Sequence, residues 1–173
     1  MAKVPVIQAP NEILNAKCTP VGANENVQEL VANLLDTLRS QRNPEGAGLA
    51  APQIGINKRV CIVRKYATSK DSEIESFKEY VLINPEITSM SDATDIKWEG
   101  CLSIPDTYGK VQRAKRVKVI ALNEKGEKIK IKAEGFFARV IQHEVDHLNG
   151  ILFTSKTIGE TLTEKELDSL MKG

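Results

Sequence analysis

Apolar residues recur at intervals of three and four in two stretches of the chain, as they do in helices that pack on one side. The first stretch covers residues 24–43 and is followed by Pro44. The second covers residues 136–148 and is followed by Asn149 and Gly150, which are typical of a helix C-terminus. A third, short helix is predicted from Thr163, which starts a capping box with the glutamate three positions later. The two apolar stripes consist of Val27, Leu30, Val31, Leu34, Leu35 and Leu38, and of Phe136, Phe137, Val140, Ile141 and Leu148.

Shorter apolar runs predict strands between these helices. Residues 46–53 are small and suggest a loop, and residues 68–79 are polar and suggest an exposed excursion. Residues 123–126 are expected to form a hairpin turn in which Gly126 adopts a positive φ. The strands are expected at Arg59–Arg64, Tyr80–Asn84, Glu86–Met90, Val117–Leu122 and Lys128–Glu134.

The order of these elements predicts the fold class. Strands that pair with sequence neighbours, with helices at the ends, favour an α+β fold with mainly antiparallel sheets over repeated βαβ units. We expect the sheets to pack around the helix of residues 136–148, which would be central. A length of 173 residues suits a single domain, residues 1–173.

Composition narrows the classes of function. Lys and Arg total 24 against 23 Asp and Glu, so a direct nucleic-acid specificity is not expected. No apolar run is long enough for a membrane span. The first ten residues resemble neither a signal peptide nor a transit peptide, which favours a cytoplasmic protein. Three widely separated cysteines also fit a reducing compartment and leave a thiol free for chemistry.

The only two histidines of the chain stand four residues apart, in the sequence His143-Glu144-Val145-Asp146-His147. On a helix, residues with this spacing lie on one face, so both imidazoles can bind one metal ion beside the carboxylate of Glu144. Such an arrangement is typical of metal-assisted hydrolysis, in which a base takes a proton from water. A structural role for both histidines is the alternative.

A catalytic metal site of this kind needs a third protein ligand. The position that would hold a third histidine in one class of metalloprotease is Phe153. Downstream glutamates lie on a stretch patterned as a solvated helix face, and Cys61 lies in a buried strand. Cys101 is the better candidate, because Gly100 allows a close approach of the backbone and Pro105 suggests a loop around it.

Three segments together resemble a known family. GAGLAAPQ at residues 46–53, EGCLS at 99–103 and QHEVDHL at 142–148 are similar to the three motifs of peptide deformylases, in the same order. The resemblance implies an enzyme that removes the formyl group from N-formylmethionine at the start of new proteins. Metal-bound hydroxide would attack the formyl carbon and release formate.

The resemblance also implies roles for individual residues. Cys101, His143 and His147 would bind one divalent metal ion, and Glu144 would act as general base and then as general acid. Fe2+ is the implied native metal, with Zn2+, Ni2+ or Co2+ possible in preparations. The Gln53 amide and the Leu102 backbone N–H would stabilise the oxyanion.

Other residues are expected to contact the substrate or support the site. Gly46, Ala47 and Gly48 lack bulky side chains, so a peptide backbone can approach them, although simple turn residues would look the same. Gly100 allows a similar approach, and Glu99 is expected to support the metal ligands. Phe136 and Val140 are candidates for the wall that receives the methionine side chain.

One position departs from the family pattern. Many relatives carry a basic residue seven positions after the motif cysteine, where this chain has Tyr108. The implied partners are N-formylmethionyl peptides of nascent chains and, transiently, the ribosome. A strongly basic C-terminal tail is not evident, since acidic and basic residues are mixed there.

Two other classes of function are alternatives. A metallopeptidase using the same helix would cleave internal peptide bonds and would keep its activity in Cys101→Ala. A binding module with structural histidines would hold no stoichiometric metal.

Overall fold

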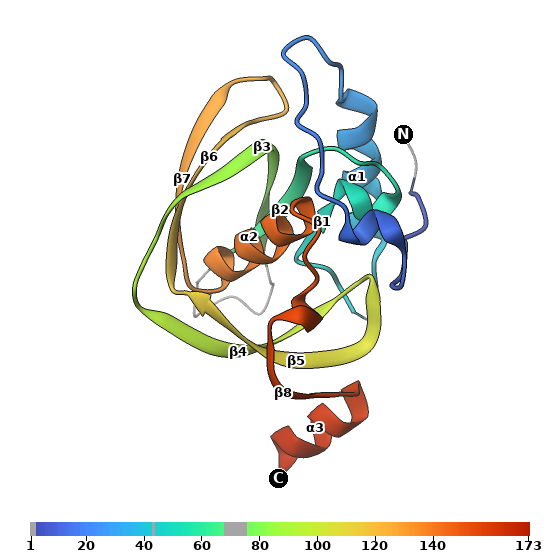
Figure 1. Cartoon of the computed structure of the whole chain (residues 1–173), viewed down its shortest axis with the longest axis vertical. Coiled ribbons are helices and arrows are strands. Elements are labelled where there is room, and N and C mark those ends of the chain that lie inside the picture. Colours follow the sequence, from blue (N-terminus) through green and yellow to red (C-terminus); the bar gives the residue numbers. More distant parts are fainter. Residues whose placement is uncertain (1–2, 43, 68–75) are drawn as a thin grey trace.

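The computed structural model describes residues 3–42, 44–67 and 76–173. Its strands form two antiparallel sheets, one of five strands in the order β1-β2-β3-β6-β7 and one of three in the order β4-β5-β8. Helix α2 lies in the middle of the molecule, between strands of both sheets (Figure 1). The elements are η1 Glu12–Asn15, α1 Gln28–Ser40, β1 Gly48–Ala50, η2 Ala51–Ile54, β2 Val60–Tyr66, β3 Phe77–Met90, β4 Thr94–Cys101, β5 Ile104–Ala114, β6 Arg116–Leu122, β7 Lys128–Glu134, α2 Gly135–Leu148, η3 Phe153–Ser155, β8 Thr157–Leu162 and α3 Glu164–Lys172.

The three predicted helices are confirmed. Helix α1 starts and ends a few residues inside the expected range, and α2 ends at Leu148 as expected. Helix α3 follows Thr163, whose hydroxyl accepts a hydrogen bond from the Glu166 N–H while the Glu166 carboxylate accepts one from the Thr163 N–H. The local signals for these helices therefore agree with the tertiary structure.

The strand predictions are confirmed in part. Strands β2, β6 and β7 and the turn with Gly126 at φ 77 are where the pattern placed them. The two strands expected at residues 80–90 are one continuous strand, β3, whose pairing with β6 shifts register near Asn84, where φ is 50. Bonds between the Asn84 side chain and the backbone of Val21 hold this irregular position.

Two segments predicted as loops are mostly regular structure. Of residues 46–53, only Gly46 and Ala47 lie outside an element, since residues 48–54 form the short strand β1 and the 3-10 helix η2. The segment around Cys101 is a hairpin in which only Leu102 and Ser103 form a turn between β4 and β5. Of the expected excursion at residues 68–79, Phe77–Glu79 belongs to β3, and residues 68–75 lie outside the described part of the chain.

Two apolar clusters hold the fold together. One lies between α2 and the five-stranded sheet, and it includes Leu82, Val117 and Ile141. The other lies on the opposite face of the sheet, where Leu34 and Leu38 of α1 pack on β1, β2 and β3. Helix α2 is therefore held rigidly by burial, which fixes the residues it carries. Among the described residues, no helix is long and apolar enough to cross a membrane.

Candidate metal centre and catalytic cavity

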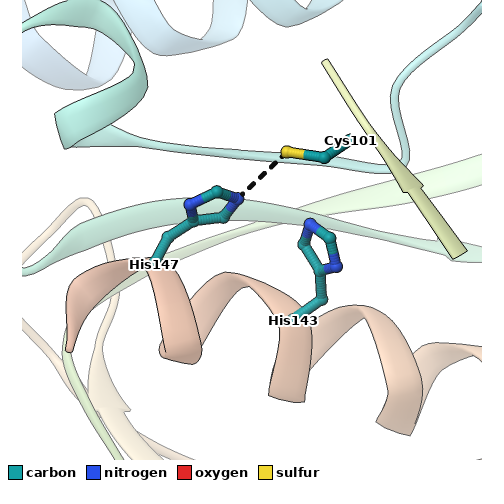
Figure 2. A group of neighbouring side chains, drawn as sticks. All are labelled: Cys101, His143 and His147. Carbon is teal, nitrogen blue, oxygen red and sulfur yellow. Dashed lines mark hydrogen bonds between the residues drawn. The ribbon is translucent and has the colours of Figure 1, made fainter. Parts of the chain in front are cut away.

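Helix α2 directs His143 and His147 to the same side, as residues four apart must be. Their ring centroids are 5.0 Å apart, and both rings point towards the end of β4 (Figure 2). The helix ends at a point where Gly150 is required, since φ is 74 there and a Cβ would lie 2.6 Å from the Asn15 carbonyl oxygen. This tight contact fixes the end of the helix that carries His147.

The third side chain of the cluster comes from the β4–β5 hairpin. Cys101 is the last residue of β4, and its Sγ lies 3.3 Å from His147 Nε2. One ligand atom each from Cys101, His143 and His147 lies within 4.8 Å of the others. The fold therefore brings Cys101, which lies 46 positions before His147 in the sequence, into one cluster with the two histidines.

The donor set fits a divalent cation. One thiol and two imidazoles around a common point suit zinc and other transition metals. Burial lowers the pKa of His147 well below its ordinary value, which leaves a neutral imidazole able to bind a cation. Burial also lowers the pKa of His143, but hydrogen bonds with Cys101 and Glu99 outweigh it and raise that pKa to about 10. The surroundings of His143 thus favour a positive charge at this place.

Glu144 lies beside this cluster and is 3% exposed. Burial raises the pKa of its carboxyl group to about 7. Its Oε2 has no hydrogen-bond partner in the described part of the chain. A Cβ on Gly48 would lie 2.8 Å from Glu144 Cγ, so the absence of a side chain at Gly48 makes room for this carboxylate. A buried carboxylate with a free oxygen is suited to proton transfer.

Glu99 connects the hairpin to the helix. Its Oε1 lies 3.0 Å from His143 Nδ1, and its two oxygens accept hydrogen bonds of 2.9 Å from Arg113. Arg139 donates to Glu99 Oε2 at 2.7 Å and also to Asp95. Although burial raises it, the pKa of Glu99 is held well below its usual range by the bonds from Arg113 and His143. Sequence reasoning missed Arg113 and Arg139, because nothing local links them to Glu99.

Gln142 makes a second link between the helix and the hairpin. Its Oε1 accepts a hydrogen bond from the Ala114 N–H at 3.1 Å, and its Nε2 donates to the Ala114 carbonyl at 2.9 Å. The side-chain amide thus pairs with β5 as a neighbouring peptide group would. Sequence reasoning gave this residue no role.

Gln53 is positioned by η2 and lies next to Cys101. Its Oε1 accepts a hydrogen bond from the Ala50 N–H, and its Nε2 donates to Ser103 Oγ at 3.0 Å and lies 3.6 Å from Cys101 Sγ. An amide nitrogen has two N–H bonds, so one can be held by Ser103 while the other faces the cluster. Sequence reasoning missed this role of Ser103.

A cavity of about 590 Å³ opens beside the cluster. Every predicted site residue lines it except His147, which is buried behind Cys101. Phe136 stands at the rim and is 57% exposed, whereas Val140 is 6% exposed. A Cβ on Gly100 would lie 2.7 Å from the Tyr108 ring, so that ring covers Gly100. The predicted residues in the cavity wall are Gly46, Ala47, Gly48, Gln53, Glu99, Gly100, Cys101, Leu102, Phe136, Val140, His143 and Glu144.

Comparison with known proteins identifies the family. The family model of polypeptide deformylase matches residues 3–162. A peptide deformylase from Halothermothrix orenii is 42% identical, over 90% of this chain and 96% of the relative. Peptide deformylase 1 from Bacillus cereus is 40% identical, over 97% of this chain and the whole of the relative.

Solved structures show the same fold. The Met-Ala-Ser-bound class I type b peptide deformylase from Acinetobacter baumannii matches with a TM-score of 0.76 and 40% identity, over 89% of this chain and 98% of that one. The enzyme from Ehrlichia chaffeensis, in complex with actinonin, matches with a TM-score of 0.80 and 29% identity, over 99% and 95%. With its cysteine and two histidines in place, this chain belongs to the polypeptide deformylase family of metal-dependent enzymes.

Proposed function

We propose that this enzyme removes the formyl group from N-formylmethionyl nascent peptides in the cytoplasm and releases formate. One observation carries the proposal: a buried carboxylate, Glu144, has an unpartnered oxygen beside the cluster of Cys101, His143 and His147. Hydrolysis of an amide by activated water requires a general base, a cation-binding site beside it and a cavity that admits the substrate. Glu144, the cluster and the cavity beside them would supply these three elements.

Cys101, His143 and His147 would hold one divalent cation per chain. Such a cation lowers the pKa of water to about 7 and polarises a carbonyl oxygen, which makes hydroxide available at neutral pH. We propose Fe2+ as the native ion, with Zn2+, Ni2+ or Co2+ as substitutes that the same donors accept. Glu99 would support the site by holding the orientation of the His143 ring through Nδ1.

Glu144 would move the protons. It accepts a proton from the attacking water, and hydroxide adds to the formyl carbon. When the bond between that carbon and the methionine nitrogen breaks, Glu144 returns the proton to the nitrogen, so that a free amine and formic acid result, and formic acid then loses its proton to water and leaves as formate. Burial supports both steps, because a carboxyl group with a raised pKa can hold a proton and release it near neutral pH.

Gln53 and Leu102 would stabilise the negative charge that develops on the formyl oxygen. Both residues line the cavity, one from η2 and the other from the turn of the β4–β5 hairpin. The bond from Gln53 Nε2 to Ser103 supports this role, because it fixes the amide in one rotamer beside Cys101. Preorganised donors of this kind need no rearrangement during the reaction.

The peptide would lie along the cavity beside β1. Strand β1 is an edge of the five-stranded sheet, and Gly46, Ala47 and Gly48 line the cavity there, so an extended backbone can pair with this edge. Phe136 and Val140 would form the wall for the methionine side chain, and Gly100 would border the path on the hairpin side. Because the Acinetobacter baumannii relative binds Met-Ala-Ser, we take short peptides with an N-terminal methionine as the substrate class. Nascent chains would bring the enzyme into transient contact with the ribosome.

The proposal is tested by formate release from formyl-Met-Ala-Ser. Protein is purified without oxygen, its metal content is measured, and it is compared with Glu144→Ala and Cys101→Ala. We expect about one metal ion per wild-type chain, loss of activity in both variants, and loss of the metal in Cys101→Ala alone. Metal-loaded wild-type protein that releases no formate but cleaves internal peptide bonds would overturn the proposal in favour of a metallopeptidase.

A further inference from the structure

The face of the five-stranded sheet that points away from α2 is only partly covered. Helix α1 packs on it over β1, β2 and β3, through residues such as Ile62 and Val81. The apolar part of this face ends near Leu122 of β6, which is paired with Ile83. Strands β6 and β7 extend beyond α1, at the far side of the sheet (Figure 1).

The uncovered part of this face is basic. In β6 and β7, side chains that face α2 are apolar, such as Val117, Val119 and Ala133. The alternate positions point the other way, as strand geometry requires, and most of them carry a positive charge. The exposed cations are Arg116 and Lys118 in β6 and Lys128, Lys130 and Lys132 in β7.

None of the five cations forms an ion pair with any residue that the structure describes. Lys118 stands directly opposite Lys132 in the β6–β7 pairing, and like charges in this relation destabilise a sheet. Acidic residues also lie at neighbouring positions, namely Glu134 opposite Arg116, Glu86 opposite Ile120, and Glu127 directly before Lys128. The chain as a whole carries a net charge of only +1, so five cations on one part of a sheet face make this surface more basic than the average of the chain.

Protection of a sheet edge explains only part of this pattern. Strand β7 is an edge, and lysines on an edge strand discourage pairing with other chains. Arg116 and Lys118 belong to β6, however, which is paired on both sides and has no edge to protect. Alternating lysine and glutamate across the two strands would also protect the edge without the repulsion between Lys118 and Lys132.

We propose that this surface docks on the phosphate backbone of RNA. Lysines at every second residue are about 6.6 Å apart along a strand, and the rows on neighbouring strands are about 4.8 Å apart. Such rows of point charges suit the closely repeated phosphates of a nucleic acid and carry no sequence readout. Within β6 and β7, only Ile120 and Leu122 are apolar side chains beside these cations on this face, and both are only partly exposed, so the surface lacks the apolar half that a membrane-binding element needs. The inference rests on the proposed function, because an enzyme of nascent chains works beside ribosomal RNA.

The experiment measures binding of the full-length, metal-loaded enzyme to a fluorescein-labelled RNA hairpin by anisotropy. If about four phosphates are contacted, we expect the affinity to fall roughly 100-fold between 50 and 200 mM salt. A variant with Lys118, Lys128, Lys130 and Lys132 changed to glutamine should bind at least about tenfold more weakly and lose most of the salt dependence. Changing the same four residues to arginine should preserve binding, because the charge is kept.

The matched control changes four other exposed lysines to glutamine, namely Lys3, Lys17, Lys165 and Lys172. It alters the net charge equally and should bind RNA as the wild type does. Formate release from formyl-Met-Ala-Ser should be the same in all variants, which also shows that they are folded. This assay keeps failure of the proposed function separate from failure of RNA docking.

Three results would overturn the inference. Equal loss in the sheet variant and the control would show that only net charge matters. No binding of wild-type enzyme to the hairpin at 50 mM salt would exclude docking on RNA. Binding to phosphatidylserine vesicles that depends on the four sheet lysines, with no such dependence for RNA, would assign the surface to a membrane instead.

Discussion

Helix α2 and the β4–β5 hairpin contribute to the same site in different ways. The helix supplies His143, Glu144 and His147 from one turn of continuous sequence, and their relative positions are set by helix geometry alone. The hairpin supplies Cys101, Leu102 and Glu99, and their positions relative to the helix depend on contacts between residues about forty or more positions apart, such as the 44 positions from Glu99 to His143. One half of the site is therefore local and the other half is tertiary.

This difference separates two kinds of damage. A change on the helix can remove a chemical group and leave the arrangement of the site intact. A change in the hairpin alters how the two halves are held together, so its effect should appear in metal affinity and stability as well as in rate. The following substitutions test that division, beginning with the largest expected effect.

Glu144→Gln should remove the proton acceptor while keeping shape and metal ligands. We expect kcat to fall by roughly 10²–10⁴-fold, the usual contribution of a general base, with unchanged metal content. Steady-state formate release and metal analysis measure both quantities. Glu160→Gln, at an exposed position in β8, is the control and should behave as wild type. A loss of less than about tenfold in Glu144→Gln would contradict the assigned role.

Glu99→Gln should damage the hairpin half. The change leaves the buried cations Arg113 and Arg139 without a full counter-charge, which should lower the free energy of unfolding by about 3–5 kcal/mol. Metal affinity should fall by about 10–100-fold, because the support of His143 is weakened. Urea unfolding and competition with a zinc chelator measure the two effects. If the rate of formate release falls while stability and metal affinity stay unchanged, Glu99 does not connect the hairpin half of the site to the helix half.

Gly48→Ala tests the contact of β1 with the helix. The new Cβ would lie 2.8 Å from Glu144 Cγ and 2.9 Å from the Ile62 carbonyl oxygen, so we expect a destabilisation of about 1–3 kcal/mol and a reduced kcat. Gly22→Ala is a matched control, because its nearest heavy atoms are 3.9 Å away. The thermal unfolding midpoints of the two variants are compared. Equal midpoints would contradict the prediction, because they would show that β1 shifts to accommodate the new Cβ without loss of stability.

Cys61→Ala should have the smallest effect. Cys61 is fully buried in β2, and burial raises the pKa of its thiol well above the ordinary value, so it is an inert core side chain. We expect a loss of about 1 kcal/mol in stability and unchanged metal stoichiometry, in contrast to Cys101→Ala. Metal analysis of the two variants distinguishes the structural cysteine from the ligand, and loss of metal in Cys61→Ala would contradict this assignment.

The sequence predicted what depends on local pattern. The helices, the β6–β7 hairpin and the α+β class follow from periodicity and turn residues, and the pairing of His143 with His147 follows from their spacing. The β4–β5 hairpin was missed because Gly100, Pro105 and several polar residues interrupt its alternation, although β4 and β5 pair along most of their length.

Other features needed the tertiary structure. The sequence assigned no role to Arg139, because its buried bonds to Glu99 and Asp95 exist only when β4 lies beside α2. Gly46 and Gly48 were interpreted as space for a substrate or as simple turn residues, and the structure shows that they leave space for Leu102 and Glu144 of the enzyme itself. Sequence spacing cannot indicate which neighbouring residue occupies the space that a glycine leaves free.

The pairing of Gln142 with Ala114 also affects how the cluster of Cys101, His143 and His147 is held together. The Gln142 amide both donates and accepts, so it sets the register between helix and hairpin with protein atoms alone. A glutamate of the same shape would lack the donor and would place a charge against the Ala114 carbonyl. Bonds within the protein thus hold the helix that carries His143 and His147 against β5. We therefore expect the three ligand side chains to stay together when an ion leaves, so that ions can exchange without refolding of the chain.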